Sequence, residues 1–554
     1  MTDPLLQISS LTIAHRDSKK EQNLIQQLHL TLHKKEVLAV VGESGSGKTI
    51  SSLSTMGLLP KPLQNIPSGE VMLNGEPLEI RSPELPVWQS IRGKRIAMIF
   101  QDPMSSLNPS MTVGKQVVEM MSTHQIHPTD QSRKKATIDW FRKVEIPHPE
   151  TAFEKYPHEM SGGQKQRVMI AMAMAANPEL IIADEPTTAL DVTVQKSILD
   201  LLKNLINQQG LSLIFISHDL DVVKNFADRI MVMLKGEVVE EGTVDQVINH
   251  PKHAYTKALI ACKPPIQSRP YPLPTVADLT AEDLKSTKAT EELKDNLSTE
   301  VILKVNDLQK RYTTSTNWLG KPTAHFTAVN GISFQLFKGE TLGLVGESGC
   351  GKSTVGKLLT GLLIGDAGEI LFKEQPLKPN RTKEERRWVQ MIFQDPFSSL
   401  NPRITAGESI VEVMKVHGIQ HTSHKDATVK LLEEVGLSAS DFSKYPHQFS
   451  GGQRQRLVIA RTLAMEPEVI ICDESVSALD VSVQAQVLNL LNQLKMERNL
   501  SYVFISHDLS VVRYMSDRIM VMKEGSIVEK GSRDDLFLRP QHTYTKKLLS
   551  SIMD

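Results

Sequence analysis

The chain contains one stretch of sequence twice. The segment YPHEMSGGQKQR at 156–167 returns as YPHQFSGGQRQR at 445–456, which is 289 residues later. From there to the end the two halves keep one register, because Asp184, Glu185 and His218 recur at the same offset as Asp, Glu and His. An internal repeat of this kind predicts two domains of one fold arranged in tandem.

Composition places the domain boundaries. Residues 263–274 are rich in proline, and a polar, charged stretch follows them, which indicates a connecting segment. We therefore expect a first domain at 1–262, a linker at 263–300 and a second domain at 301–554. The offset between the halves drifts near the start of the second one, which predicts an extra loop at 315–321.

Length and charge exclude several classes of protein. A chain of 554 residues with 40 % hydrophobic residues is too long for one core and has the composition of a multidomain globular protein. The net charge of −1 gives no positive field that would favour nucleic acid as a partner. The cysteines Cys262, Cys350 and Cys472 are too few for a four-thiolate metal site. We find neither a signal peptide nor an apolar run of about 20 residues, so we expect a cytosolic chain without membrane spans.

Short apolar runs lead into glycine-rich loops in both halves. The runs EVLAVVG at 36–42 and ETLGLVG at 340–346 have the pattern of buried strands, and further apolar runs alternate with helical patterns. This alternation predicts an α/β fold around a mainly parallel sheet. The segments at about 102–160 and 395–449 lack such runs, and we expect them to be helical subdomains.

A phosphate-binding loop follows the first of these runs in each half. GESGSGKT and GESGCGKS both fit the pattern GxxxxGK[ST], in which backbone N–H groups and a helix N-terminus hold phosphate oxygens. The lysine would neutralise the β- and γ-phosphates of ATP, and the next hydroxyl would bind Mg²⁺. One such loop could be a glycine-rich turn with a chance lysine, but two in matching positions argue against chance. The predicted ATP-binding residues are Gly42, Glu43, Ser44, Gly45, Ser46, Gly47, Lys48 and Thr49, and Gly346, Glu347, Ser348, Gly349, Cys350, Gly351, Lys352, Ser353 and Thr354.

A pair of carboxylates ends a later strand in each half. Asp184 and Asp473 are suited to hold Mg²⁺ through water. The following residues, Glu185 and Glu474, could orient and deprotonate the attacking water. An Asp-Glu pair alone is more often a solvated turn. Because a phosphate-binding loop lies upstream in each half, we prefer the interpretation as a catalytic pair.

Taken in order, these motifs resemble the ATP-binding cassette (ABC) ATPases over nearly the whole chain, and within them the importers of oligopeptides, dipeptides and glutathione. The resemblance implies two tandem P-loop NTPase domains, each with a RecA-like sheet, an antiparallel β region and a helical subdomain. The SGGQ signature, which other P-loop NTPases lack, implies that each domain contacts the γ-phosphate held by the other in an antiparallel pair. Fusion would make this pairing intramolecular. The signature residues are Ser161, Gly162, Gly163 and Gln164, and Ser450, Gly451, Gly452 and Gln453.

Further site residues follow from the resemblance alone. In the family, a glutamine senses Mg²⁺ and the attacking water, a histidine contacts the γ-phosphate, an aspartate communicates between domains, and an aromatic ring stacks on adenine. The corresponding residues are Gln101, Gln394, His218, His507, Asp191, Asp480 and Tyr312, and the expected Mg²⁺ ligands are Thr49, Gln101, Asp184, Ser353, Gln394 and Asp473. His15 takes the place of Tyr312 in the first half and is a weaker stacking platform. Ser475 in the second half takes the place of Pro186 in the first. We therefore expect a looser local backbone at the second site.

The segments FQDPMSSLNPSMTVG and FQDPFSSLNPRITAG resemble the permease-docking surface of peptide importers. Met104, Leu107, Phe397 and Leu400 are candidate contacts, and subdomain core is the alternative for each. The resemblance implies an ATPase, which converts ATP and water to ADP and phosphate, at the cytoplasmic face of the inner membrane. Its implied partners are two transmembrane permease subunits and a periplasmic peptide-binding protein, with membrane contact through the permeases only.

Alternative functions remain at this point. The fused arrangement is most similar to the ATPase subunit of a microcin C-type oligopeptide importer or of a glutathione importer. Some dipeptide-importer relatives carry a cysteine cluster for an iron–sulfur centre, and we expect none here. A soluble twin-cassette protein that acts on ribosomes or DNA would show a densely charged linker or a zinc-ligand insertion, and neither is evident. A regulatory module without turnover conflicts with the two retained glutamates.

Overall fold

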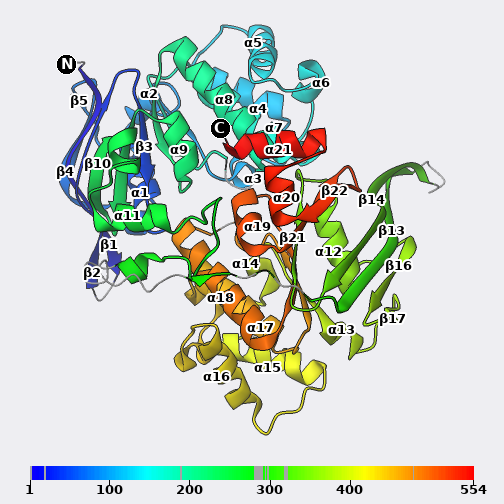
Figure 1. The fold of residues 1–554 in the computed structure, drawn as a ribbon. Coiled ribbons are helices and arrows are strands. Elements are labelled where there is room, and N and C mark those ends of the chain that lie inside the picture. The colour runs from blue at the N-terminus through cyan, green and yellow to red at the C-terminus, as the bar shows by residue number, and fades with distance from the viewer. Residues whose placement is uncertain are drawn as a thin grey trace. The chain divides into compact units, whose positions relative to one another are not determined.

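The structure of the protein, a computed structural model, describes residues 3–17, 20–187, 190–279, 291–293, 295, 298–316, 322–477 and 479–553. The chain divides into two compact units. The first consists of Met1–Leu190, Val194–Ala261 and Val276–Leu284, and the second of Asp191–Thr193, Cys262–Thr275 and Lys285–Asp554. Both units are α/β, as the sequence predicts (Figure 1). Most of the extra loop expected at 315–321 lies outside the described residues.

The described residues of the first unit form two sheets. A four-stranded antiparallel sheet has the order β2-β1-β4-β5, and a six-stranded sheet has the order β10-β9-β3-β8-β7-β6, in which only the β9–β10 pair is antiparallel. The strands β7 and β8 are buried along their whole length, which is typical of parallel strands covered on both faces. The strands are β1 (Pro4–Asp17), β2 (Lys20–His33), β3 (Val37–Val41), β4 (Asn65–Leu73), β5 (Glu76–Pro77), β6 (Ile96–Ile99), β7 (Leu180–Asp184), β8 (Ser212–Ile216), β9 (Arg229–Leu234) and β10 (Glu237–Thr243).

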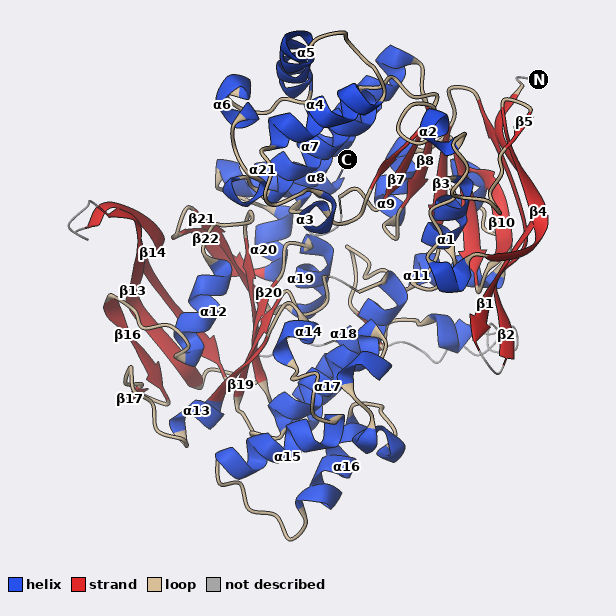
Figure 2. Cartoon of the chain, turned by 180° about the vertical axis from the view of Figure 1, so that it is seen from behind, coloured by secondary structure: helices blue, strands red, loops and turns tan. Residues whose placement is uncertain are grey.

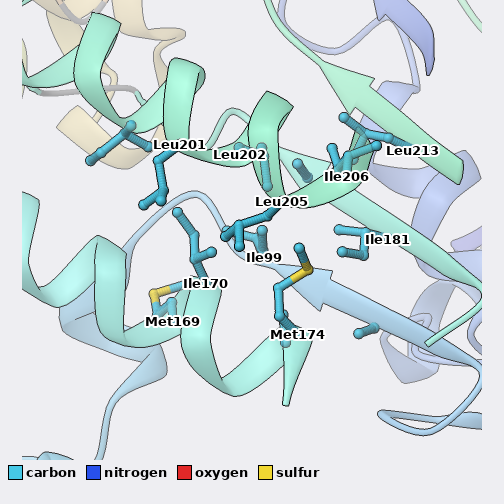
Figure 3. Packing of buried hydrophobic residues seen from close by; sticks show 14 of the residues in the cluster. Ile99, Met169, Ile170, Met174, Ile181, Leu201, Leu202, Leu205, Ile206 and Leu213 are labelled. Atoms are coloured by element: carbon cyan, nitrogen blue, oxygen red, sulfur yellow. The ribbon is translucent and has the colours of Figure 1, made fainter. Parts of the chain in front are cut away.

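Helices cover the larger sheet and form the region expected to be helical. They are α1 (Lys48–Thr55), α2 (Trp88–Ile91), α3 (Pro103–Ser106), α4 (Val113–Thr123), α5 (Asp130–Lys143), α6 (Pro149–Phe153), α7 (Gly162–Met174), α8 (Val192–Gln209), α9 (Leu220–Phe226), α10 (Val244–Ile248) and α11 (Ala254–Ala261). Figure 3 shows Ile170 and Met174 of α7 and Leu205 of α8 packing with Ile99 and Ile181 of the sheet. This shared core joins the helical region firmly to the strands that carry the site.

The second unit repeats this architecture. Its two larger sheets have the orders β14-β13-β16-β17 and β18-β19-β20-β15-β21-β22, and β11 pairs with β12 in a small additional sheet. The strands are β11 (Pro270–Tyr271), β12 (Glu291–Glu292), β13 (Val301–Thr316), β14 (Pro322–Phe337), β15 (Thr341–Val345), β16 (Ala367–Phe372), β17 (Gln375–Pro376), β18 (Val389–Ile392), β19 (Val469–Asp473), β20 (Ser501–Ile505), β21 (Arg518–Lys523) and β22 (Ser526–Ser532). The helices are α12 (Lys352–Thr360), α13 (Glu385–Trp388), α14 (Pro396–Ser399), α15 (Ala406–Val416), α16 (His424–Glu434), α17 (Gly451–Leu463), α18 (Val481–Arg498), α19 (Leu509–Met515), α20 (Arg533–Leu538) and α21 (Thr543–Met553).

The helix after the second phosphate-binding loop lies between the two sheets of its unit. Figures 1 and 2 show α12 with the antiparallel strands β13, β14 and β16 on one side and the six-stranded sheet on the other. Figure 2 shows α15 and α16 beside α17, which also contacts α18 and β18. No helix in the described part of the chain is both long and apolar enough to cross a lipid bilayer.

The first part of the expected linker packs on the second unit. Arg269 is only 7 % exposed, and its guanidinium donates to the carbonyls of Tyr514 and Met515 at 2.7 and 3.3 Å, at the end of α19. It also pairs with Asp295 at 2.7 Å and with the buried Asp517 at 3.4 Å. Carbonyls at a helix C-terminus and carboxylates both favour a cation, so this segment is anchored by charge as well as by packing.

We expect the Arg269→Ala change to lower the free energy of unfolding of the full chain by about 2–4 kcal/mol, because it leaves a buried carboxylate and two helix-end carbonyls with fewer partners. Urea denaturation of the full chain measures this. The matched control is Lys338→Ala, which removes an exposed ion pair with Glu300 and should change stability by less than about 1 kcal/mol. Equal effects of the two changes would contradict the anchoring role of Arg269.

Candidate functional site

The two phosphate-binding loops have the same backbone geometry. Each begins directly after a buried strand, β3 or β15, and each ends where a helix begins at Lys48 or Lys352. Gly42 and Gly346 have φ of 150° and 155°, and a Cβ atom at either position would lie 2.2 Å from a carbonyl oxygen of the neighbouring strand. Only glycine fits there, because the loop passes so close to the strand.

The lysine of each loop is buried and bonded to its own loop. Lys48 Nζ donates to the carbonyls of Gly42 and Glu43 at 2.7 and 2.9 Å. Lys352 Nζ makes the equivalent bonds at 2.6 and 2.9 Å. The position of the ammonium group is thus set by backbone carbonyls of the loop.

A hydroxyl and a carboxylate meet beside each loop. Thr49 Oγ1 donates to Asp184 at 3.2 Å, and Ser353 Oγ donates to Asp473 at 3.0 Å. Burial raises the pKa of Asp184 to about 6; the Thr49 hydrogen bond opposes this shift and the charge of Glu185 adds to it. Burial likewise raises the pKa of Asp473. A buried carboxylate in this state would be stabilised by a cation.

A glutamate, a glutamine and a histidine meet next to this pair in both units. The Gln101 amide donates to Glu185 Oε2 at 2.9 Å, and His218 Nδ1 lies 3.2 Å from the same oxygen. In the second unit Gln394 and His507 contact Glu474 Oε2 at 2.7 and 3.4 Å. The structure therefore brings together the glutamine, glutamate and histidine that the resemblance singled out.

The glutamates occupy an uncommon backbone conformation. Glu185 and Glu474 have φ of 45° and 47°, which places them in the left-handed region. Non-glycine residues in this region concentrate at functional sites, where surrounding contacts hold them. Their N–H groups donate to strand carbonyls at 3.0 and 2.9 Å. The two glutamates share this conformation although Ser475 stands in the second unit where Pro186 stands in the first, and the looser backbone expected there stays a prediction.

Charges in the second site favour an ionised glutamate. Burial acts to raise the pKa of Glu474, but the hydrogen bond with His507 and the charges of His507 and Lys352 outweigh it, so the pKa is lowered. Burial acts to lower the pKa of His507, and the bond to Glu474 outweighs that effect and raises it. An ionised, hydrogen-bonded carboxylate is the form that can accept a proton from water.

The SGGQ signature is a helix cap, which the sequence analysis did not foresee. Ser161 Oγ accepts from the Gln164 N–H at 3.3 Å, and the Gln164 side chain accepts from the Ser161 N–H at 3.1 Å. Ser450 and Gln453 form the same reciprocal pair at 3.3 and 3.0 Å. The pattern S-x-x-Q is the sequence signal for this capping box. It fixes the N-terminus of α7 and of α17, where N–H groups can bind an anion.

The remaining residues of the prediction lie on other elements. Asp191 and Asp480 directly precede the long helices α8 and α18. Tyr312 is partly exposed on β13, where Lys310 Nζ lies 5.9 Å from its ring centroid. His15 lies on the matching strand β1 of the first unit and is partly buried.

The structure separates the four candidate docking residues into two kinds. Met104 and Phe397 are 61 % and 58 % exposed. Leu107 and Leu400 are 2 % and 4 % exposed, so the interpretation as docking contacts is wrong for them and the alternative, subdomain core, holds. The leucines end short helices and turn inward, whereas Met104 and Phe397 lie within the first turn of α3 and α14.

A phosphate-binding loop, an adjacent hydroxyl–aspartate pair and a glutamate held by glutamine and histidine define each unit as a P-loop ATPase domain. Residues 25–188 and 329–477 match the ABC transporter family, and residues 239–286 and 528–554 match the family described as oligopeptide/dipeptide transporter, C-terminal region. The chain belongs to the ABC transporter family. Its place in the oligopeptide, dipeptide and glutathione branch is confirmed by these matches together with relatives that are glutathione import ATP-binding proteins.

Known relatives span almost the whole chain. The Glutathione import ATP-binding protein GsiA of Escherichia coli (strain K12) is 43 % identical over 567 residues, which cover 99 % of this chain and 89 % of that protein. GsiA of Salmonella typhimurium is 44 % identical over 562 residues, with the same coverage. A solved structure of the ATP-binding cassette MJ0796 with ADP and phosphate matches 43 % of this chain and 98 % of its own at 26 % identity, with a TM-score of 0.38. This chain is the ATP-binding, ATP-hydrolysing subunit of an ABC transporter.

The two glycines of the second signature differ in the space around them. A Cβ atom on Gly452 would lie 2.3 Å from Val483 Cγ1 of α18, whereas one on Gly451 would have its nearest neighbour, Leu479 Cδ2, at 3.9 Å. We expect Gly452→Ala to lower the free energy of unfolding by about 1–3 kcal/mol through overpacking. Gly451→Ala is the matched control and should leave stability unchanged or raise it by up to about 1 kcal/mol. Urea denaturation compares them, and a stable Gly452→Ala variant would contradict the close packing of α17 on α18.

Proposed function

We propose that this chain drives the import of small peptides, a class that includes the tripeptide glutathione. Two transmembrane permease subunits and a periplasmic binding protein would complete the transporter, with this chain at the cytoplasmic face of the inner membrane. The relatives named for glutathione import and the match to the oligopeptide/dipeptide C-terminal region support this assignment. We call the glutamate with its glutamine and histidine partners the glutamate constellation. It is the observation that carries the proposed ATP hydrolysis, and it is present in both units with the same contacts.

The site residues divide the chemistry among them. The loops at 42–49 and 346–354 would bind the phosphates of ATP through backbone N–H groups, and Lys48 and Lys352 would neutralise their charge. Glu185 and Glu474 would each accept a proton from the attacking water, with the glutamine and histidine beside them fixing the carboxylate. The signature helix of the opposite unit would contact the γ-phosphate, as in the family.

Mg²⁺ fits the donors beside each loop. Thr49 with Asp184, and Ser353 with Asp473, offer one hydroxyl and one carboxylate, which are the hard oxygen ligands that Mg²⁺ prefers. Two protein donors suit an ion that takes its other ligands from phosphates and water. Burial raises the pKa of Asp184 to about 6, and a divalent cation beside this carboxylate would favour its ionised form. When bound, Mg²⁺ would neutralise developing charge on the phosphates.

We expect two hydrolytic sites, which glutamate-to-glutamine changes can test. Glu185→Gln and Glu474→Gln should each lower kcat for ATP, and the double variant should fall by about 10²–10⁴-fold, because a positioned general base contributes on that order. The measurement is phosphate release by the purified chain, with uptake of labelled glutathione and of a labelled hexapeptide by cells that carry each variant.

The two single variants serve as controls for each other, because the same carboxylate-to-amide change is made in each site. An unchanged kcat for Glu474→Gln, together with complete loss for Glu185→Gln, would contradict two working sites. Full peptide uptake by the double variant would contradict the importer assignment itself.

We also expect Met104 and Phe397 to contact the permeases. The Arg454 guanidinium stacks on the Phe397 ring at 3.7 Å, and Lys165 Nζ lies 2.8 Å from Met104 Sδ. Lys165 and Arg454 are the residues that directly follow the SGGQ signature, so each exposed side chain contacts the signature helix of its own unit. Phe397→Ala should lower ATPase stimulation by the reconstituted permeases several-fold and leave basal ATPase unchanged. Val416→Ala, an exposed change on α15, is the control. Equal stimulation of the Phe397→Ala and Val416→Ala variants would exclude docking at Phe397.

A further inference from the structure

A tyrosine near the end of each domain contacts the phosphate-binding loop of the same unit. The Tyr255 hydroxyl, from α11, accepts the N–H of Glu43 at 3.0 Å, and the Tyr544 hydroxyl, from α21, accepts the N–H of Glu347 at 3.1 Å. These tyrosines are 5 % and 8 % exposed. Both lie in the stretches that match the oligopeptide/dipeptide C-terminal region, which contributes no residue to the proposed hydrolysis mechanism.

Each tyrosine is held by hydrogen bonds that are the same in both units. The Glu240 carboxylate accepts the N–H groups of Lys252 and His253 at 2.7 and 3.1 Å, and His253 Nδ1 accepts the Tyr255 N–H at 3.1 Å. The second unit repeats these three bonds at 2.7, 3.1 and 3.1 Å, with Glu529, Gln541, His542 and Tyr544. The segment before each tyrosine is thus fixed to the last strand of its sheet, β10 or β22.

The tyrosine and the lysine hold the two ends of one peptide group. The Gly42 carbonyl accepts from Lys48 Nζ at 2.7 Å, and the N–H of the same peptide, at Glu43, donates to Tyr255. A trans peptide is planar and its C=O and N–H point in opposite directions, so a rotation that breaks one bond breaks the other. The Gly346–Glu347 peptide is held in the same way by Lys352 and Tyr544.

This peptide needs such support because it begins at a glycine. Gly42 and Gly346 have positive φ, where the backbone of glycine has more accessible conformations than that of any other residue. Burial raises the pKa of Tyr544 to about 12, so the phenol stays neutral and its oxygen remains a hydrogen-bond acceptor over the physiological range.

We infer that Tyr255 and Tyr544 are positioning residues that set the phosphate-binding lysines through the Gly42–Glu43 and Gly346–Glu347 peptides. The C-terminal region of each domain thereby becomes part of its nucleotide site. This inference rests on the proposed role of Lys48 and Lys352 in binding phosphate.

The test compares Tyr544→Phe with Tyr514→Phe in the full chain. Both variants also carry Lys48→Ala, which should weaken nucleotide binding at the first loop so that the measured Kd reports on the second. Tyr514 is the matched control because its hydroxyl donates to the Pro270 carbonyl at 2.9 Å, away from the loop in sequence and contact. The Kd of a fluorescent ATP analogue should rise about two- to tenfold in Tyr544→Phe, the loss expected for one hydrogen bond. It should stay unchanged in Tyr514→Phe, whatever either change does to the melting temperature.

A double-mutant cycle with Lys352 separates positioning from simple destabilisation. With the corresponding ADP analogue, whose β-phosphate the lysine would also neutralise, Tyr544→Phe should raise the Kd when Lys352 is present and have no further effect in Lys352→Ala. An unchanged Kd in Tyr544→Phe, or an equal rise with and without Lys352, would overturn the inference. If Lys352→Ala alone leaves the Kd unchanged, the proposed role of the lysine fails instead. The mirror experiment, Tyr255→Phe with Lys352→Ala, covers the case in which Tyr544→Phe does not fold.

Discussion

Each site depends on buried charges that backbone groups hold in place. The ammonium groups of Lys48 and Lys352 are held by loop carbonyls at 2.6–2.9 Å, so their positions are set before any phosphate is present. A flexible lysine side chain loses up to about 2 kcal/mol of rotational entropy when it is fixed. Where the protein has already fixed it on folding, less of that loss falls on nucleotide binding. This is the physical advantage of a preorganised site.

The parallel sheet gathers the other charges. The strands β3, β7 and β8 lie side by side, and their carboxyl ends carry, in turn, the phosphate-binding loop, the Asp184–Glu185 pair and the segment with His218. Carboxyl ends of parallel strands meet at one edge, so Thr49 and Asp184, which are 135 positions apart in sequence, come within hydrogen-bonding distance. The second unit uses β15, β19 and β20 in the same way. Contacts of Gln101 and Gln394 then connect this edge to the helical region.

The sequence could predict the chemistry better than the packing around it. The loop, the carboxylates and the α/β class follow from local patterns, because each pattern needs only its own neighbours to be recognised. Leu107 and Leu400 could not be separated from Met104 and Phe397, since exposure in a short helix is decided by contacts that are distant in sequence. The anchoring of Arg269 on the end of α19 was likewise hidden, because a proline-rich stretch has the composition of a linker whether or not it packs. The capping box in SGGQ could have been predicted from its spacing, because S-x-x-Q is the sequence signal for that motif.

Comparison of the two units shows where sequence change has been tolerated. The distances that define the glutamate constellation differ by only about 0.2 Å between units, and the glutamate φ values agree within a few degrees, although Pro186 has become Ser475. Side chains at the surface have changed character: Met104 on Lys165 corresponds to Phe397 on Arg454, and His15 corresponds to Tyr312. Hydrogen-bond geometry in a hydrolytic site has little freedom, because a shift of a few tenths of an ångström weakens the bond. A docking contact can change together with its partner. Constant chemistry with divergent surfaces is therefore the pattern expected if both units hydrolyse ATP and each one contacts a different permease subunit.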